Sequence, residues 1–390
     1  MKKGILIAAA VAVGGLLALQ ANTWIENRRA LTGMTKSPFE VDGKPILVQN
    51  KTVPAGLPDL RAASKRVLQS VVSVDASAIE DFFGQRQVTS LGGGSGVIIS
   101  ENGYIVTNNH VITNSSRGRP AELLRVHLPD DTIVEGKLVG FDQRSDLAVI
   151  KVDRKGLIPI DQDATYKPEI GEWVIAAGSP LGYDNTISVG VISSLNREVD
   201  LSASGNEQRG GASILTEAIQ TDAAINPGNS GGALTNVNGT LLGINTVIAT
   251  NTGTNVGIGF AIPASRLRQV ASDIIKYGYV KYGFLGVTVY QNSEVLRYER
   301  ARRDYETQVG AYPPSEGLIV EVVRPDSPAA KLGIERYSIL LSIDGKPMQR
   351  PVDMQKALLT AAPGTKVKVK FWKMGKTYEG TATLTELKNN

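Results

Sequence analysis

The sequence contains no cysteine among its 390 residues. This absence excludes disulfide bonds, thiol nucleophiles and cysteine-based zinc sites. Histidine is nearly as scarce, with two residues, so chemistry that needs an imidazole base has few candidates. No long basic stripe appears, because 42 basic and 38 acidic side chains are interspersed and leave a net charge of +4. We therefore expect no nucleic-acid partner, since such a partner requires a concentrated basic surface.

Glycine, by contrast, is abundant, with 41 residues that separate short apolar runs. From Val71 to Ile262 about a dozen such runs follow one another with no long helix between them. This pattern is typical of an antiparallel barrel or sandwich. The sequence therefore predicts a mainly β protein.

The N-terminus has the features of an export signal. Met1 is followed by two lysines, and the stretch from Gly4 to Leu19 carries no charged side chain. Residues 1–21 are predicted to be either a retained membrane anchor, which we favour, or a cleaved signal peptide. In both cases the rest of the chain faces away from the cytoplasm, in the cell envelope.

Composition divides the remaining chain into three parts. Residues 22–58 are polar with scattered prolines and are interpreted as a stalk or linker. Residues 59–276 form the first β-rich domain, which ends in a helix with apolar residues at three- and four-residue steps. A second β-rich domain is predicted over residues 281–388.

The segment Asn226–Gly232 is the strongest candidate for a catalytic loop. Ser230 lies among glycines, which allow a tight turn and a close approach of substrate to the backbone. The N–H groups of Gly228 and Ser230 could then stabilise an oxyanion. The segment could also be an ordinary turn between strands, so the other groups of a catalytic site must be identified.

A serine hydroxyl needs a base to remove its proton. His127 alternates with apolar residues in a predicted strand and is interpreted as a solvent-facing side chain. His110 follows the predicted strand Tyr104–Val106, at a strand-to-loop junction where a rigid scaffold can present a base. His110 is therefore the predicted base.

The base in turn needs a carboxylate that orients the imidazole. Asp146 directly precedes the apolar run from Leu147, and an acid at the start of a buried strand is expected to have a partner. Asp142, Asp153 and Asp222 remain alternatives on chemical grounds alone.

The order His110, Asp146, Ser230 is that of chymotrypsin. The segments Thr107–Ile112, Ser145–Lys151 and Asn226–Gly232, with Gly92–Ile98 and Val256–Pro263, closely resemble the HtrA/Deg family of serine proteases. The resemblance covers roughly residues 60–387. It implies a chymotrypsin-like double barrel in which His110 is the base, Asp146 its partner and Ser230 the nucleophile. It also implies an oxyanion hole formed by Gly228 and Ser230.

In a chymotrypsin-like barrel the specificity pocket is formed by residues before the nucleophile and on the following strand. Here these residues are Ile225, Asn245, Thr246 and Val247. They carry no charge, which favours a small or medium aliphatic P1 residue. Alternatively, some of these side chains belong to the barrel core.

The second domain begins with Tyr282–Val287, which resembles the carboxylate-binding loop of PDZ domains in HtrA proteins. Phe284, Leu285, Gly286 and Val287 are predicted to bind a peptide C-terminus, because successive N–H groups can hold a carboxylate. The peptide would then add a strand along the sheet edge. The stretch 291–314 is longer than usual in the family and charged, and is interpreted as a solvated helix or as a contact surface.

The resemblance implies a serine endopeptidase of the cell envelope, similar to the anchored members with one PDZ domain that act in stress response and protein quality control. It implies a homotrimer that cleaves polypeptides and binds hydrophobic C-terminal peptides. No metal or organic cofactor is expected. The alternative is a latent protease that acts mainly as a periplasmic chaperone or peptide sensor.

Overall fold

The computed structural model describes residues 34–41, 44–49, 60–82, 85–114, 118–179, 185–200, 214–248, 257–290, 293–359 and 361–387. The chain separates into two compact units, residues 1–59 and 60–390. In the first unit, β1 (Met34–Val41) and β2 (Lys44–Gln49) pair as an antiparallel hairpin within the predicted stalk. The predicted signal or anchor, residues 1–21, lies outside the described residues. Among the helices described, none is long and apolar enough to cross a membrane.

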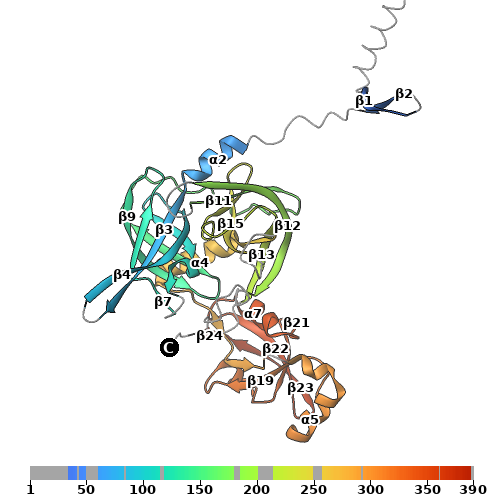
Figure 1. Ribbon diagram of the computed structural model, residues 1–390. Helices are drawn as coiled ribbons and strands as arrows, with labels where there is room; N and C mark the ends of the chain where they lie inside the picture. The colour runs from blue at the N-terminus through green and yellow to red at the C-terminus, as the bar shows by residue number, and fades with distance from the viewer. Residues whose placement is uncertain are drawn as a thin grey trace, which may run out of the picture. The chain divides into compact units, whose positions relative to one another are not determined.

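The second unit begins with α2 (Leu60–Leu68) and a closed six-stranded barrel (Figure 1). The barrel order is β10-β5-β4-β3-β8-β9. The strands are β3 (Val71–Phe82), β4 (Gln85–Ile98), β5 (Tyr104–Asn108), β8 (Leu123–His127), β9 (Ile133–Asp142) and β10 (Leu147–Val152). The short α3 (Asn109–Ile112) follows β5, and β6 (Thr113–Asn114) pairs with β7 (Arg119–Pro120).

A second closed barrel follows in the order β11-β12-β13-β16-β15-β14. Its strands are β11 (Trp173–Gly178), β12 (Thr186–Asp200), β13 (Ile214–Thr221), β14 (Ala233–Asn236), β15 (Leu241–Ile248) and β16 (Gly259–Pro263). The two barrels confirm the predicted chymotrypsin-like double barrel.

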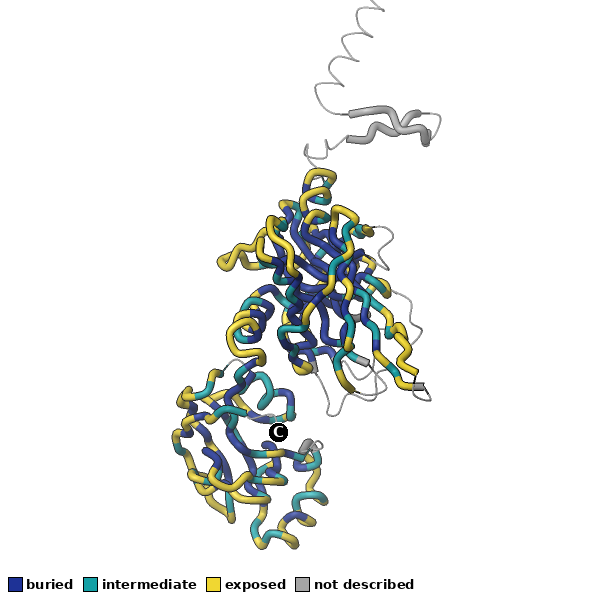
Figure 2. Tube along the Cα trace, turned by 90° about the vertical axis from the view of Figure 1, so that its left-hand side faces the viewer, coloured by how far each residue is buried: buried dark blue, intermediate teal, exposed yellow. Residues whose placement is uncertain are grey.

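Alternation along the strands explains how the barrels fill. Val72, Val74 and Ala76 of β3 point into the first barrel, whose core they share with Ile98 and Ile105. Figure 2 shows these buried segments at the centre of the domain, with exposed residues on the outside. The second barrel has its own core of small and branched side chains. Because both interiors are filled, catalytic groups must come from the ends of strands and from loops.

The helix α4 (Ala264–Tyr277) ends the double-barrel domain. Leu267, Val270 and Ile274 lie on one face and are buried in the core between the barrels. Gly278 ends the helix with a left-handed backbone, φ 82°. The sequence predicts a helix that ends the first β-rich domain at residue 276, and α4 ends at Tyr277; the domain limit itself stays a prediction.

The C-terminal domain is built on the sheet β18-β19-β20-β22-β23, with β21 paired to β20 and a separate β17–β24 pair. The strands are β17 (Gly283–Phe284), β18 (Val287–Val289), β19 (Leu318–Val323), β20 (Ile339–Ile343), β21 (Lys346–Pro347), β22 (Lys366–Lys373), β23 (Lys376–Thr383) and β24 (Thr385–Glu386). Its helices are η3 (Ser293–Arg297), α5 (Glu299–Val309), α6 (Pro328–Lys331) and α7 (Pro351–Leu359).

Both faces of this sheet are covered. Leu318 and Val320 join the main core with α7, whereas Ile319 faces a smaller cluster with Trp372 and Tyr305. Tyr305 comes from α5 and Leu296 of the same cluster from η3, so these two helices cover the second sheet face. The solvated-helix interpretation therefore holds for one side of α5, where Arg300 and Arg303 are exposed.

Candidate active site

Strand pairing brings His110 and Asp146 together. Leu147 of β10 lies opposite Asn108 of β5, so the residues just beyond the two strand ends are neighbours. The Asn109 N–H donates to the Asp146 carbonyl at 3.0 Å. The His110 Nδ1 lies 2.7 Å from the Asp146 Oδ2. The buried strands thus fix the imidazole against the carboxylate.

The Asp146 carboxylate is 1% exposed and makes hydrogen bonds with three donors. Its Oδ2 contacts His110 Nδ1 and accepts from Thr246 Oγ1 at 2.8 Å, and its Oδ1 accepts from the His110 N–H at 3.1 Å. A carboxylate beside Nδ1 favours the tautomer with the proton on that nitrogen, which leaves Nε2 as the acceptor. Asp146 also adopts φ 55°, a strained conformation for a residue with a side chain.

Ser230 lies in a loop between β13 and β14 that begins with a tight turn. The Asn229 N–H donates to the Asn226 carbonyl at 2.9 Å, with Pro227 and Gly228 at the two central positions. Gly228 has φ 101°, which a type II turn requires at that position and which glycine adopts without strain. Within the described residues, no hydrogen bond engages the N–H of Gly228 or Ser230.

Ser95 of β4 holds this loop against the first barrel. Its N–H donates to the Ser230 carbonyl at 2.8 Å and its hydroxyl to the Gly228 carbonyl at 2.5 Å. A Cβ on Gly231 would lie 2.1 Å from the Ser95 carbonyl oxygen, so only glycine fits there. The sequence pattern alone predicts no role for Ser95, although Ser95 lies in one of the segments that resemble the family.

The Ser230 hydroxyl donates to the Thr246 carbonyl at 2.8 Å. Within the described residues, no hydrogen bond joins it to His110. A hydroxyl has one proton, so the side chain must rotate before Nε2 can accept that proton. Thr246 therefore contacts both halves of the site, with its carbonyl on Ser230 and its hydroxyl on Asp146.

The residues predicted to form the specificity pocket are mostly buried. Ile225 is 1% exposed and belongs to the core of the second barrel. The Asn245 amide donates to the carbonyls of Ala177 and Ala233. Thr246 is directed to Asp146, and the side chain of Val247 lies outside the described residues. Their role as pocket walls stays a prediction.

Among the alternative carboxylates, Asp142 is also buried. Its Oδ2 accepts from the N–H and hydroxyl of Ser145 and, at 2.5 Å, from the hydroxyl of Tyr282. Burial, reinforced by Asp142, raises the pKa of Tyr282, so the phenol stays protonated and donates. Asp142 thus joins the turn before Asp146 to the start of the C-terminal domain.

His127 lies on a strand and is partly exposed, in line with the prediction, and its Nε2 lies 2.8 Å from the Asp75 Oδ2. The two side chains come from the neighbouring strands β3 and β8. Cross-strand pairs of this kind depend on register, which the sequence alone did not supply.

The predicted carboxylate-binding loop has the geometry that the prediction requires. Gly286 has φ 93°, and a Cβ there would lie 2.1 Å from the Ser327 Cβ. The carbonyls of Leu285 and Gly286 accept from Ala329 and Arg324, at 2.9 Å each. No hydrogen bond engages the N–H of Leu285 or Gly286 among the residues described. Peptide binding by Phe284, Leu285, Gly286 and Val287 stays a prediction.

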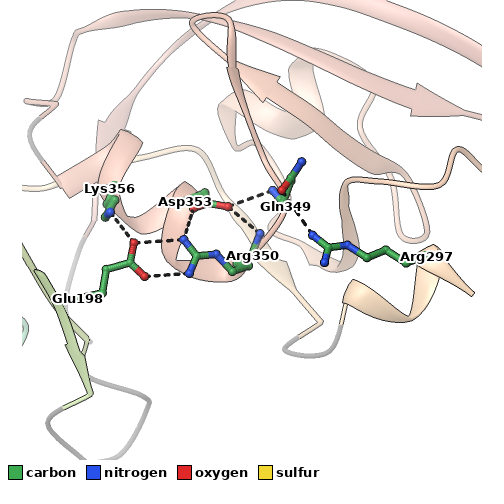
Figure 3. Close-up of polar contacts among 6 residues, drawn as sticks. All are labelled: Glu198, Arg297, Gln349, Arg350, Asp353 and Lys356. Carbon is green, nitrogen blue, oxygen red and sulfur yellow. Dashed lines mark hydrogen bonds and ion pairs between the residues drawn. The ribbon is translucent and has the colours of Figure 1, made fainter.

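A second contact joins the two domains at Glu198 of β12 (Figure 3). Arg350, which directly precedes α7, lies 2.9 Å from one Glu198 oxygen, and Lys356 lies 2.5 Å from the other. The hydrogen bond from Lys356, with those from Arg350, lowers the pKa of Glu198 below its usual 4.5.

Within the described residues, no group of three or more histidine, aspartate or glutamate side chains could hold a metal ion. Two family models match the chain: a trypsin-like peptidase domain over residues 94–244 and a PDZ domain over residues 283–384. The first match contains His110, Asp146 and Ser230. The second contains the predicted peptide-binding loop.

Curated relatives are named probable periplasmic serine endoproteases, DegP-like. The protein of Brucella suis is 34% identical over 299 residues, which cover 76% of this chain and 53% of the relative. That of Pseudomonas fulva is 37% identical over 291 residues, covering 75% and 55%. The chain thus spans about half the length of these relatives.

Solved structures match over nearly their whole length. The HtrA-type protease AlgW with a decapeptide has 31% identity and a TM-score of 0.65, covering 85% of this chain and 100% of that one. The serine endoprotease from Yersinia pestis has 32% identity and a TM-score of 0.58, covering 85% and 98%. With its trypsin-like domain and one PDZ domain, the chain belongs to the HtrA family of serine endoproteases.

Proposed function

We propose that this protein hydrolyses peptide bonds in polypeptides, with Ser230 as nucleophile, His110 as base and Asp146 as its orienting partner. The observation that carries the proposal is the 2.7 Å contact between His110 Nδ1 and Asp146 Oδ2, on strands that face the Ser230 loop. A buried carboxylate on Nδ1 has the function of making Nε2 a proton acceptor.

The reaction follows from these contacts. His110 removes the Ser230 proton as the oxygen attacks the scissile carbonyl, and then gives the proton to the leaving amine. Asp146 stabilises the imidazolium that forms in between. Gly228 and Ser230 offer N–H groups to the tetrahedral oxyanion. Ile225, Asn245, Thr246 and Val247 are proposed to shape the pocket for an aliphatic P1 residue.

The alternative function, a latent protease that acts as chaperone or peptide sensor, is supported by the hydrogen bond from Ser230 to the Thr246 carbonyl. That bond engages the proton that His110 must accept. A hydrogen bond of this kind contributes about 1 kcal/mol to the stability of the resting arrangement. A low basal activity that rises on ligand binding is therefore consistent with the same site.

For the whole protein, we propose a periplasmic enzyme that degrades unfolded or regulatory proteins in the stress response. The names of the relatives and the apolar segment 1–21 support the location, with that segment as a membrane anchor or a cleaved signal. The family resemblance supports a trimer and regulation by C-terminal peptides at the PDZ domain. The domain limits 1–21, 22–58, 59–276 and 281–388 are part of this proposal.

Casein cleavage by the wild type and by Ser230→Ala tests the enzymatic function. We expect measurable turnover in the wild type and loss of at least about three orders of magnitude in the variant. Ser95→Ala serves as a comparison, because it retains the nucleophile and removes one of its supports. Equal and negligible turnover of wild type and Ser230→Ala, with and without C-terminal peptides, would favour the chaperone or sensor.

A further inference from the structure

The free edge of the C-terminal sheet begins at the proposed carboxylate-binding loop. Strand β18 is the first strand in the sheet order and pairs with β19 alone within the described chain. A peptide whose carboxylate is held at Leu285–Val287 must run antiparallel to β18 if it adds to this edge. We refer to this path, from Leu285 to Tyr290, as the peptide track.

The peptide track is short. Strand β18 has three residues, which span about 10 Å. The last three or so residues of a bound peptide would lie beside the strand, and those about four to six positions from the C-terminus would pass its end. Beyond that end, the described chain resumes at η3 and continues into α5.

The helix α7 also connects the two ends of the peptide track. After its C-terminal end, the Ala361 carbonyl accepts from the Gly283 N–H at 2.8 Å, next to the carboxylate-binding loop. Before its N-terminal end, Gln349 accepts from Arg297 of η3 at 3.5 Å (Figure 3). The far end of the track is therefore flanked by Arg297 and Gln349.

Arg297 has no ion-pair partner among the described residues, unlike the neighbouring cations Arg350 and Lys356. Arg350 and Lys356 share Glu198, and Arg350 also pairs with Asp353. The contact of Arg297 is a long hydrogen bond to a neutral amide, and its side chain is exposed. A guanidinium in this state can bind a carboxylate through two parallel hydrogen bonds.

Gln349 is well placed to support that binding. Its amide nitrogen donates to Glu316 at 2.9 Å, which orients its carbonyl oxygen toward Arg297. Its backbone N–H donates to Asp353 at 3.1 Å. The neighbouring carboxylates Glu316 and Asp353 are thereby engaged with Gln349, and Arg297 remains available to a ligand.

We propose that Arg297, positioned by Gln349, forms a subsite for an acidic side chain about four to six residues upstream of the C-terminus of a bound peptide. This inference rests on the proposed function of the PDZ domain in binding C-terminal peptides. The proposal gives η3, through Arg297, a role in selecting the bound peptide.

The test uses the full chain with Ser230→Ala, so that no peptide is cleaved. Fluorescein-labelled ten-residue peptides ending in Val-Ile-Leu carry Asp, Ser or Lys at the fourth, fifth or sixth position from the C-terminus. Anisotropy at low salt gives each Kd. At one of the three positions, we expect the Asp peptide to bind about two- to fivefold tighter than the Ser peptide, and the Lys peptide to bind weaker still.

The preference for Asp should disappear in Arg297→Gln and persist in the matched control Arg300→Gln, an exposed arginine on α5. Equal Kd values at all three positions, or a preference that survives Arg297→Gln, would overturn the subsite. C-terminally amidated peptides separate the two proposals. If amidation abolishes binding but the acid has no effect, only the subsite is wrong. If amidation does not change the Kd, the proposed carboxylate-binding loop is wrong. The subsite proposal depends on that loop and is then wrong too.

Discussion

The two sides of the active site differ in how completely they are assembled. On the first barrel, His110 and Asp146 are already paired, and the carboxylate accepts two further hydrogen bonds. On the second barrel, the loop of Ser230 is held in place by Ser95, but its hydroxyl donates to the Thr246 carbonyl. The scaffold therefore prepares the base and the loop, and leaves one side-chain rotation to complete the site.

This difference has a structural origin. The base side rests on paired strands, whose register is fixed by buried side chains. The nucleophile lies on a loop, and a hydroxyl rotates between rotamers at a small cost in energy. Control of activity is thus expected on the nucleophile side. Among substitutions that keep Ser230, the loss of activity is expected to be largest on the base side.

The largest effect is expected from Asp146→Asn. The amide is similar in size to the carboxylate, but it does not stabilise an imidazolium and favours the wrong tautomer of His110. We expect kcat to fall by about four orders of magnitude, with little change in KM. Steady-state kinetics on a fluorogenic peptide checks this. Activity within about tenfold of wild type would show that the base side is not the catalytic half that we describe.

Thr246→Val is expected to weaken the base side by a smaller amount. The variant removes the hydroxyl that donates to Asp146 but leaves the carbonyl that accepts from Ser230. Loss of a hydrogen bond to a charged group predicts a decrease of about 10- to 100-fold in kcat/KM. Thr246→Ser is the matched control and should retain most activity. Equal kinetics for the two variants would contradict a role for this hydroxyl.

Tyr282→Phe tests the hydrogen bond from Tyr282 to Asp142, close to His110 and Asp146. The variant removes the buried hydrogen bond to Asp142, in the turn that leads to Asp146. We expect the free energy of unfolding to fall by about 1.5 kcal/mol. Tyr279→Phe is the control, because the hydroxyl of Tyr279 bonds Glu386 at an exposed position. Denaturant unfolding should show a smaller loss for this control, and equal losses would argue against a special role for the buried bond.

The smallest effect is expected from Glu198→Gln, at the contact between β12 and α7. Interactions of exposed charges of this kind contribute about 0.2 to 1 kcal/mol. Because the folded state lowers the pKa of Glu198, its contribution is present above the usual pKa of 4.5 and is lost as the pH falls below that value. Thermal unfolding of both proteins between pH 3 and 7 should therefore converge at acidic pH. A difference that grows on acidification would contradict this ion pair.

The sequence predicted the parts of the molecule that depend on local pattern. Strand alternation and glycine spacing predicted an antiparallel barrel or sandwich, and the family resemblance narrowed this to two barrels. The scarcity of histidine reduced the candidates for the base to His110 and His127. The type II turn follows from Pro227 and Gly228, because these residues favour its two central positions. Turn preferences of this kind depend on adjacent residues, and the packing of the neighbouring barrel does not change them here.

The roles of Ser95 and Thr246 could not be predicted in the same way. Each depends on which residue of another strand or loop lies opposite, and a bulge shifts the register of β15 close to Thr246. The sequence predicts Thr246 as a wall of the specificity pocket, whereas in the structure its hydroxyl is directed at Asp146. The packing of Tyr305 on the second sheet face could not be predicted either, because the stretch 291–314 contains few apolar residues.

Covalent labelling with diisopropyl fluorophosphate tests most directly whether His110 activates Ser230. The account predicts one adduct per chain, located at Ser230 by peptide mass mapping, and a labelling rate that falls by orders of magnitude in His110→Gln. Labelling at another residue in the active wild type, or an unchanged rate in His110→Gln, would contradict it.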